Sequence, residues 1–212
     1  MTALIVIAKA PVAGRVKTRL CPPCTPEQAA ALATAALADT LDAVAAAPAD
    51  RRVCVLDGEP GPWLPEGFEV LPQRGDGLDE RLAAAFEDVR DPALLVGMDT
   101  PQLTAGHLRD GLDALAAPDC DAVLGLAPDG GYWAIGLRRP DRALFTGVPM
   151  SSHETGAAQR ERLVGHGLRV TMLAELRDVD TIDDARVVAD LAHPTSRFAV
   201  ALRRIDTTEA FA

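Results

Sequence analysis

Short apolar runs alternate along the chain with longer stretches in which apolar side chains recur at helical spacing. Leu4–Ala8 is apolar throughout, which is typical of a strand buried on both faces of a parallel sheet. The other runs that predict strands are Arg52–Leu56, Phe68–Leu71, Ala93–Gly97, Ala122–Leu126, Tyr132–Leu137 and Leu168–Leu173.

Helix signals fill the stretches between these runs. Thr25 is an expected N-cap, with Pro26 in the first turn and Gln28 at the capping-box position, and it starts an Ala- and Leu-rich helix to about Ala47. The remaining predicted helices are Leu78–Val89, the stretch from the cap Thr104 to Leu115, His153–His166, Ile182–Leu191 and Phe198–Ile205.

The alternation of strand and helix predicts an α/β fold, a three-layer α/β/α architecture with a mostly parallel central sheet. Asp129–Leu137 interrupts the alternation and predicts a hairpin-like excursion. We expect a single domain over residues 1–192, followed by a helical tail over 193–212. Such sheets bind ligands beyond the carboxyl ends of their strands, where the strand order reverses.

Composition narrows the class of protein. Hydrophobic residues make up 48% of the 212 residues and charged residues 25%, as in ordinary soluble domains. No apolar run predicts a bilayer span, and ALIVIA is too short for a signal-peptide core, so we expect a cytoplasmic protein with no membrane partner. The formal net charge of -10 argues against binding to a nucleic acid polymer.

The four cysteines are Cys21, Cys24, Cys54 and Cys120. Cys21 and Cys24 have the spacing of a redox pair, but they lie between a loop and a helix without a thioredoxin-like context. Cys54 and Cys120 do not supply the second pair that a zinc site requires. We therefore predict free thiols.

The positive charge of the chain is concentrated after the first strand, in AKAPVAGRVKTRL. Four cations follow one another without an acid before Glu27, and the only two Lys residues of the chain are among them: Lys9, Arg15, Lys17 and Arg19. Gly14 allows backbone to approach an anion, Lys17 supplies a point charge, and the arginines can fork onto phosphate oxygens. The loop is neither a Walker A loop nor GxGxxG, and a solvated basic loop is the alternative.

Carboxylates follow later apolar runs. Asp99 ends a buried strand in GMDTP, and Asp180 is expected to end a later strand in the same way in DVDT, so both are expected at the same sheet edge. One or two carboxylates together with ligand phosphates suit Mg²⁺, although both aspartates could instead cap the following turns. Asp129-Gly130-Gly131-Tyr132 is expected to form a tight turn. Its two glycines allow the backbone to approach a ligand closely, although any hairpin would use the same residues.

Four segments, APVAGRVKTRL, GMDTPQL, APDGGYWAIGL and ELRDVDTIDDA, resemble a bacterial glycosyltransferase-A-like family labelled domain of unknown function 2064, within the nucleotide-diphospho-sugar transferase superfamily. They are more distantly similar to guanylyltransferases acting on phospholactate and on molybdenum cofactor. The resemblance runs from about Ala3 to Leu191. The chain departs from the usual residues of this family at Asp79, Met150 and Ser152. These departures affect the expected acceptor-binding side of the site more than the phosphate-binding side.

This resemblance implies a nucleotide, either an NTP or an NDP-sugar, and a small-molecule acceptor. It implies Mg²⁺ or Mn²⁺ on Asp99 and Asp180, and a base near Gln73 to Arg81. The predicted nucleotide-binding residues are Lys9, Pro11, Gly14, Arg15, Lys17, Thr18, Arg19, Gln73, Gly75 and Arg81. The predicted substrate-binding residues are Asp129, Gly130, Gly131, Tyr132, Ser151 and Ser152.

A metal-dependent transferase is the function that these residues favour, with Lys17, Arg19 and Asp99 as catalytic residues. The number of cations in the first loop modestly favours nucleotidyl transfer from an NTP. Glycosyl transfer from an NDP-sugar is the alternative, with Asp129 as a candidate base, and a nucleotide-binding module without catalysis is a third. The C-terminal helix is a candidate surface for a homodimer.

Overall fold

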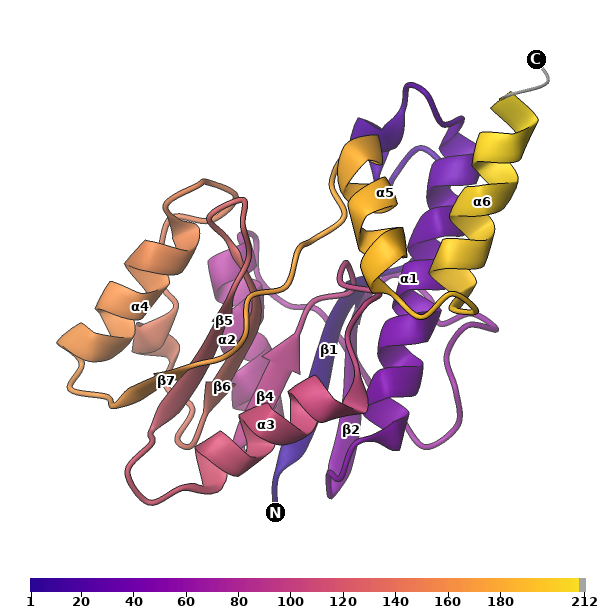
Figure 1. Cartoon of the computed structure of the whole chain (residues 1–212). Coiled ribbons are helices and arrows are strands. Elements are labelled where there is room, and N and C mark those ends of the chain that lie inside the picture. The colour runs from indigo at the N-terminus through magenta and orange to yellow at the C-terminus, as the bar shows by residue number, and fades with distance from the viewer. Residues whose placement is uncertain (210–212) are drawn as a thin grey trace.

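The computed structural model describes residues 1–209, which fold around one seven-stranded sheet (Figure 1). The strands are β1 Ala3–Lys9, β2 Arg51–Asp57, β3 Glu69–Pro72, β4 Ala93–Val96, β5 Ala122–Leu126, β6 Tyr132–Leu137 and β7 Val170–Met172. The α-helices are α1 Pro26–Ala46, α2 Leu78–Val89, α3 Ala105–Ala116, α4 Thr155–Gly165, α5 Ile182–Leu191 and α6 Arg197–Glu209.

The strand order is β3-β2-β1-β4-β6-β5-β7. Strands β3, β2, β1 and β4 pair in parallel and β5 pairs in parallel with β7, whereas β6 runs antiparallel to both β4 and β5. The expected mostly parallel sheet and the hairpin of β5 and β6 are therefore confirmed. Because β2 lies on one side of β1 and β4 on the other, the order reverses at β1, where a ligand crevice is expected.

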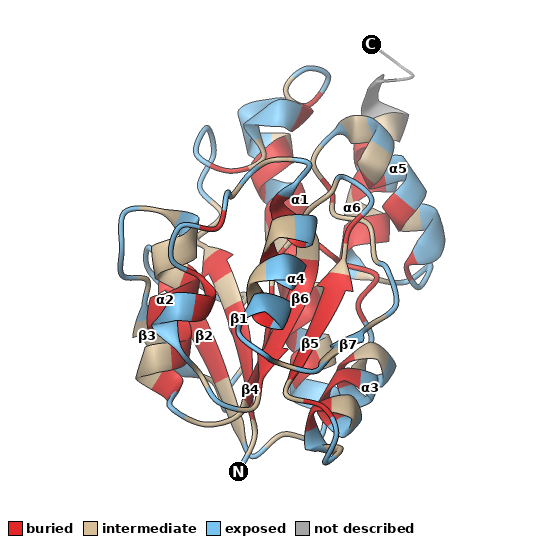
Figure 2. Ribbon diagram, turned by 90° about the vertical axis from the view of Figure 1, so that its left-hand side faces the viewer, coloured by how far each residue is buried: buried red, intermediate tan, exposed pale blue. Residues whose placement is uncertain are grey.

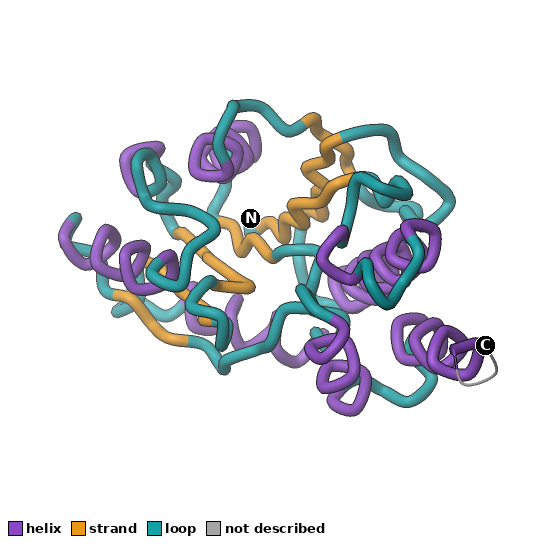
Figure 3. Tube along the Cα trace, turned by 90° about the horizontal axis from the view of Figure 1, so that it is seen from above, coloured by secondary structure: helices purple, strands orange, loops and turns teal. Residues whose placement is uncertain are grey.

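Side-chain alternation along the strands builds two cores, one on each face of the sheet. Leu4 and Val6 of β1 pack toward α1 and α3, while Ile5 packs toward α2 and α4. Figure 2 shows the buried strands in the middle of the molecule, and Figure 3 shows helices on both sides of them. The three-layer α/β/α architecture predicted from the sequence is thus confirmed.

Helix α1 is apolar nearly all round because it is covered on two sides. Leu37 and Leu41 face the sheet, whereas Leu32 and Ala36 pack against α5 and α6. The sequence analysis predicts no apolar run that could span a bilayer. This prediction is wrong, because α1 is both long enough and apolar enough to do so. Its most apolar window is 61% buried within the fold, as in the core helix of a folded domain.

Local differences from the sequence prediction lie at element ends. Helix α4 begins at Thr155 rather than His153, because Ser152 and Thr155 first close a turn, in which the Thr155 amide donates to the Ser152 carbonyl at 3.1 Å. Strand β7 is shorter than predicted and covers Val170–Met172. As predicted, no disulfide joins any of the four cysteines within the described residues 1–209.

The C-terminal helix α6 packs on α1 through Phe198, Leu202 and Ile205, so these apolar side chains are buried within the chain. Asp39 of α1 fixes the start of α6, since its Oδ2 accepts from the Phe198 amide at 2.9 Å and its Oδ1 from the Arg197 amide at 3.1 Å. Residues 210–212 of the predicted tail lie outside the described residues.

Asp39→Ala is expected to lower the free energy of unfolding by about 1–2 kcal/mol, because two amides at the start of α6 lose their acceptor. Urea denaturation measures the change, and limited proteolysis reports whether α6 detaches. Asp113→Ala, which removes an exposed carboxylate on α3, is the matched control. Equal stability of the two variants would show that α6 needs no cap from α1.

Candidate functional site

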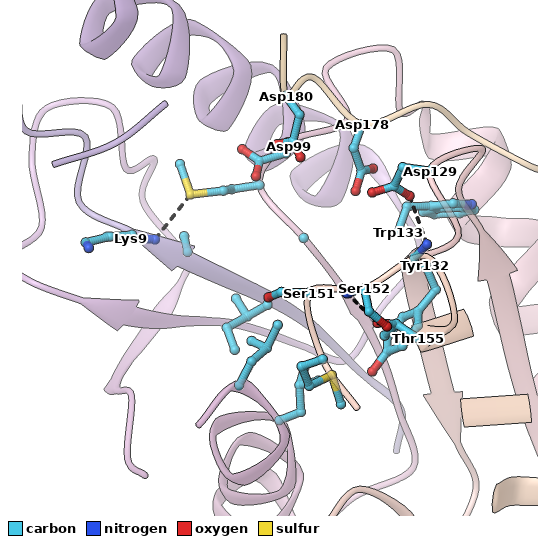
Figure 4. A pocket seen from close by; sticks show the side chains of 18 of the residues that line it. Lys9, Asp99, Asp129, Tyr132, Trp133, Ser151, Ser152, Thr155, Asp178 and Asp180 are labelled. Carbon is cyan, nitrogen blue, oxygen red and sulfur yellow. Dashed lines mark hydrogen bonds between the residues drawn. The ribbon is translucent and has the colours of Figure 1, made fainter. Parts of the chain in front are cut away.

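Two adjoining cavities lie at the carboxyl ends of β1 and β4, where the strand order reverses. Their volumes are about 720 Å³ and about 280 Å³, in the range of small-molecule sites. The residues that line both are Lys9, Arg19, Met98, Asp99 and Asp180. The larger cavity extends from there to the β5–β6 turn and to Ser151 and Ser152 (Figure 4).

Lys17 connects the two predicted metal ligands. Its Nζ lies 2.8 Å from Asp99 Oδ2 and 3.3 Å from Asp180 Oδ1, and Arg19 Nη1 lies 3.2 Å from Asp180 Oδ2. The first-loop cations and the later carboxylates therefore face one another across the cavities. The ammonium group holds the place between two carboxylates that a divalent cation would take.

The loop after β1 is anchored on both sides of Lys17. Val16 is buried in the core beneath α1, and Leu20 is buried among the residues of α1, α5 and α6. Lys17 itself has the left-handed conformation, with φ 47° and ψ 39°, which costs energy for a residue with a side chain. The two anchors and this backbone turn direct the lysine side chain inward, where it is 10% exposed.

Burial of Lys17 disfavours its charged form. The charges of Asp99 and Asp180 and their hydrogen bonds to the ammonium outweigh this desolvation, so the pKa of Lys17 lies above its ordinary value. Lys17 is therefore a permanent cation at physiological pH, which suits a group that must bind carboxylate or phosphate.

A strap of extended chain between β7 and α5 carries the second carboxylate. The buried Gln102 holds this strap by donating from Nε2 to the Arg177 carbonyl at 2.7 Å, and the Val179 amide donates to the Asp99 carbonyl at 3.0 Å. The expectation that Asp180 ends a strand is wrong, because β7 stops at Met172. Docking of the strap against Asp99, rather than strand pairing, brings Asp180 to the site.

Asp178 is the site residue that the sequence analysis did not select. It lines the larger cavity, and its Oδ1 is buried without a hydrogen-bond partner. Burial, and then the charges of Asp99 and Asp129, raise the pKa of Asp178 to about 7. Its i, i+2 spacing from Asp180 was the available signal, since alternate residues of an extended segment share one face.

The acidic groups fit a hard divalent cation. Asp99 Oδ1, like Asp178 Oδ1, is a buried oxygen without a hydrogen-bond partner (Figure 4 shows both side chains). Among residues 1–209, no three His, Cys, Asp or Glu side chains are grouped closely enough to hold a metal by themselves. Two carboxylates completed by ligand phosphates and water are the usual donor set of Mg²⁺.

The predicted phosphate-binding residues divide into two groups. Lys9, Arg15, Thr18 and Arg19 line the smaller cavity beside Lys17. Pro11 and Gly14 are not among the residues that line either cavity. Gly14 has a φ of 75°, and a Cβ there would meet nothing within 4 Å, so the glycine serves the turn of the loop rather than a close contact.

The residues predicted near the base of the nucleotide mostly form hydrogen bonds and ion pairs within the protein. Gln73 lines the larger cavity, but its Nε2 donates to the carbonyls of Ala8 at 2.7 Å and Val55 at 3.3 Å. Arg81 pairs with Asp57 at 3.6 Å and donates to the Gly75 carbonyl at 3.1 Å. Neither Gly75 nor Arg81 lines the two cavities.

The turn between β5 and β6 is packed against the start of α4. Gly130 has a φ of 91°, and a Cβ there would lie 2.0 Å from the His153 carbonyl oxygen, so packing alone requires glycine. Gly130 faces a separate cavity, whereas Asp129 and Gly131 line the larger one. Asp129 is held by its Oδ1, which accepts from the Gly131 amide at 2.9 Å.

Tyr132, Ser151 and Ser152 also line the larger cavity. The Tyr132 hydroxyl donates to Gln159 Oε1 at 3.3 Å, and burial, with a smaller contribution from Asp79, raises its pKa. Tyr132 therefore presents its ring rather than an ionisable oxygen. Ser152 Oγ accepts from the Glu154 amide at 3.2 Å and helps to start α4.

Comparisons with known proteins find solved structures of similar fold. A Desulfovibrio desulfuricans G20 protein, provisionally named a nucleotide-diphospho-sugar transferase, is 26% identical, with a TM-score of 0.86 over 97% of this chain and 95% of the other. The manganese complex of Rv0371c from Mycobacterium tuberculosis H37Rv is 22% identical, with a TM-score of 0.51 over 88% and 96%.

The 2-C-methyl-D-erythritol 4-phosphate cytidylyltransferase of Thermus thermophilus is 17% identical, with a TM-score of 0.56 over 95% of this chain and 99% of the other. No curated protein matches the sequence. A family model described as "Uncharacterized protein conserved in bacteria (DUF2064)" matches residues 29–152. The chain therefore belongs to the DUF2064 family, and its fold is that of the nucleotide-diphospho-sugar transferases and cytidylyltransferases.

Proposed function

We propose that the protein is a divalent-metal-dependent transferase that uses a nucleotide donor, either an NTP or an NDP-sugar, and a small-molecule acceptor. The contact of the Lys17 ammonium with Asp99 and Asp180, at 2.8 and 3.3 Å, is the observation that carries the proposal. It joins a cationic loop to two carboxylates at the reversal of strand order, beside a cavity large enough for two small ligands.

Asp99 and Asp180 are the proposed ligands of Mg²⁺ or Mn²⁺, with Asp178 beside them. When bound, the ion would neutralise negative charge on the phosphates of the donor. Lys17 and Arg19 would then exchange their carboxylate partners for phosphate oxygens, since Lys17 lines the smaller cavity and Arg19 lines both. Lys9, Arg15 and Thr18 would hold the same phosphates from the smaller cavity.

The chain's own residues then stabilise the departing phosphate or diphosphate. Lys17 and Arg19 supply positive charge where negative charge develops, and the buried Val16 and Leu20 anchor the loop that carries them. Holding donor and acceptor together in one cavity contributes the rest of the rate acceleration.

Two reactions share this arrangement. Nucleotidyl transfer from an NTP is favoured by the four cations of the first loop, and glycosyl transfer from an NDP-sugar by the carboxylates Asp129 and Asp178 on the other side of the cavity. A module that binds nucleotide without catalysis would need no metal. A cytoplasmic location and a homodimer formed through the C-terminal helix stay predictions.

Thermal unfolding with each NTP and with common NDP-sugars, with and without Mg²⁺, tests the proposal. A nucleotide at a hundredfold excess over its Kd is expected to stabilise the protein by about 2.7 kcal/mol, and more in the presence of Mg²⁺ than in its absence. Asp99→Ala should remove the metal-dependent part, whereas Asp113→Ala on α3 should not.

The pattern of ligands selects among the reactions. Stabilisation by NTPs alone, followed by release of pyrophosphate, selects nucleotidyl transfer, and stabilisation by NDP-sugars selects glycosyl transfer. Binding that is equal in Asp99→Ala and independent of metal selects the module. The absence of any shift with all nucleotides would falsify the proposal.

A further inference from the structure

One wall of the larger cavity is contributed by the β5–β6 turn, the start of β6 and the segment that leads into α4. Figure 4 shows Asp129, Tyr132, Ser152 and Thr155 across the pocket from Lys9. We call this surface the far wall, and its lining residues are Asp129, Gly131, Tyr132, Met150, Ser151, Ser152, His153 and Thr155.

The far wall carries no arginine or lysine among the residues that the structure describes. Its one basic side chain, His153, is exposed and lies 3.9 Å from Glu154 Oε1. Asp129 belongs to the wall, and Asp178 lines the same cavity. A phosphate or carboxylate bound here would face two acidic side chains without a strong cationic partner.

Backbone amides do not replace the missing cations. The start of α4 points an N-terminus toward the wall, but its first amides already have acceptors within the protein. Glu154 donates to Ser152 Oγ at 3.2 Å, Thr155 to the Ser152 carbonyl at 3.1 Å, and Gly156 to the Gly130 carbonyl at 2.8 Å. These three amides are therefore already engaged and do not offer the larger cavity the usual anion site of a helix N-terminus.

The surface offers instead the features that bind a neutral molecule with hydroxyl groups. Ser151 is exposed toward the centre of the pocket, and Asp129 keeps Oδ2 available while Oδ1 is held by Gly131. The Tyr132 ring and Met150 add apolar area, which Leu78 and Leu82 of α2 continue. Carboxylates and hydroxyls accept hydrogen bonds from ligand hydroxyls, while apolar side chains cover C–H surface.

We propose that the far wall binds the acceptor of the transfer and that this acceptor is an uncharged polyhydroxy compound, such as a sugar or polyol, rather than a phosphorylated molecule. The inference rests on the proposed function and names the acceptor class for that site. An acceptor hydroxyl oxygen bonds to the transferred group of the donor, the bond from that group to the leaving phosphate breaks, and the phosphate takes the electron pair. The hydroxyl proton passes to the Asp129 carboxylate.

Matched pairs of acceptors test this assignment. Glucose, myo-inositol and glycerol are each compared with their own monophosphate, in the presence of Mg²⁺ and the nucleotide that the thermal experiment selects. Trp133 lines the cavity, and in a Trp63→Phe background it is the one tryptophan, so its fluorescence reports binding. Mass spectrometry of the products reports transfer.

The expected result is that at least one uncharged member binds and accepts the transferred group, whereas its monophosphate binds at least about tenfold more weakly, the order of magnitude expected for one unfavourable charge contact. Tighter binding or faster transfer with the monophosphates overturns the inference, and so does the absence of binding by every uncharged member.

A charge introduced into the wall provides a second test. Met150→Lys should shift the preference of the protein toward the monophosphates by about tenfold, because it supplies the missing cation. Val164→Lys adds the same charge at an exposed position of α4 outside the cavity and should leave the preference unchanged. An equal preference in the two variants contradicts the assignment.

The two proposals fail in different ways. Absence of any nucleotide-dependent stabilisation refutes the proposed function before an acceptor is added. Metal-dependent nucleotide binding together with a preference for phosphorylated acceptors leaves the proposed function intact and refutes only the neutral acceptor.

Discussion

The Lys17→Met protein is expected to bind Mn²⁺ about tenfold more tightly than the parent protein in the absence of nucleotide, a gain of about 1.4 kcal/mol. In the parent protein, the Lys17 ammonium forms ion pairs with both Asp99 and Asp180, and an incoming metal ion must displace it. Methionine keeps much of the length of the side chain but has no charge, so both carboxylates become available to the ion.

The same substitution is expected to weaken nucleotide binding about a hundredfold, the range seen when one partner of a close charge pair is removed. Opposite changes in metal and nucleotide affinity are the signature of a cation that exchanges carboxylates for phosphates. Calorimetry with Mn²⁺ alone, and then with nucleotide, measures both constants.

Arg15→Met is the matched control for Lys17→Met. Arg15 belongs to the same loop and carries the same charge, but it is exposed and lines the smaller cavity and a further cavity beside Asp57. It should change Mn²⁺ affinity by less than about threefold, because only long-range charge is lost, and that is screened by salt. An unchanged or reduced Mn²⁺ affinity in Lys17→Met would show that the lysine does not compete with metal.

Asp178→Asn is expected to stabilise the nucleotide-free, metal-free protein at neutral and alkaline pH, by about 1–2 kcal/mol after allowance for its partial exposure to solvent. The pKa of Asp178 is raised to about 7 in the folded state, chiefly by burial. Ionisation of Asp178 therefore costs more in the folded protein than in the unfolded chain, where the ordinary pKa of aspartate is about 3.9.

The sign of the pH dependence follows from these two pKa values. Between about pH 4 and pH 7 the folded protein binds the proton that the unfolded chain has released, so the contribution of Asp178 to stability falls as the pH rises. Below pH 4 both states are protonated, and above about pH 7 both are ionised, so the contribution is constant at each end.

Urea denaturation with a chelator present, repeated from pH 4 to pH 8.5, measures the difference in stability between Asp178→Asn and the parent. This difference should grow up to about pH 7 and then level off. Asp113→Asn, which neutralises an exposed carboxylate of α3, should show little such growth. A difference that is flat across this range, or an Asp178→Asn protein that is less stable at pH 8, contradicts the assigned environment.

Sequence reasoning was most successful where one signal acts over a short stretch of chain. The capping box predicted at Thr25 is formed, and Thr104 caps α3 as predicted, with the side chain of each threonine accepting from a first-turn amide. Apolar runs located the strands, because a strand covered by helices on both faces needs continuous apolar residues. The basic loop and Asp99 followed from strand ends, which meet at one edge of a parallel sheet.

The site was less predictable where side chains of one type had more than one use. Gln73 donates its hydrogen bonds to strand carbonyls, and Arg81 donates to the Gly75 carbonyl and pairs with Asp57. Gly130 is required by the nearby His153 carbonyl rather than by a ligand. Nothing in the local sequence distinguishes a glutamine or glycine that serves the scaffold from one that contacts substrate.

The sequence by itself determined the order of strands and helices, the mostly parallel sheet and the collection of cations after β1, because these depend on spacing and composition within short windows. Only the tertiary structure decided that β6 lies between β4 and β5, that the strap through Val179 docks on Asp99, and that Lys17 meets Asp180 across 163 residues of chain. The physical reason is that contacts between distant segments are set by the packing of whole layers.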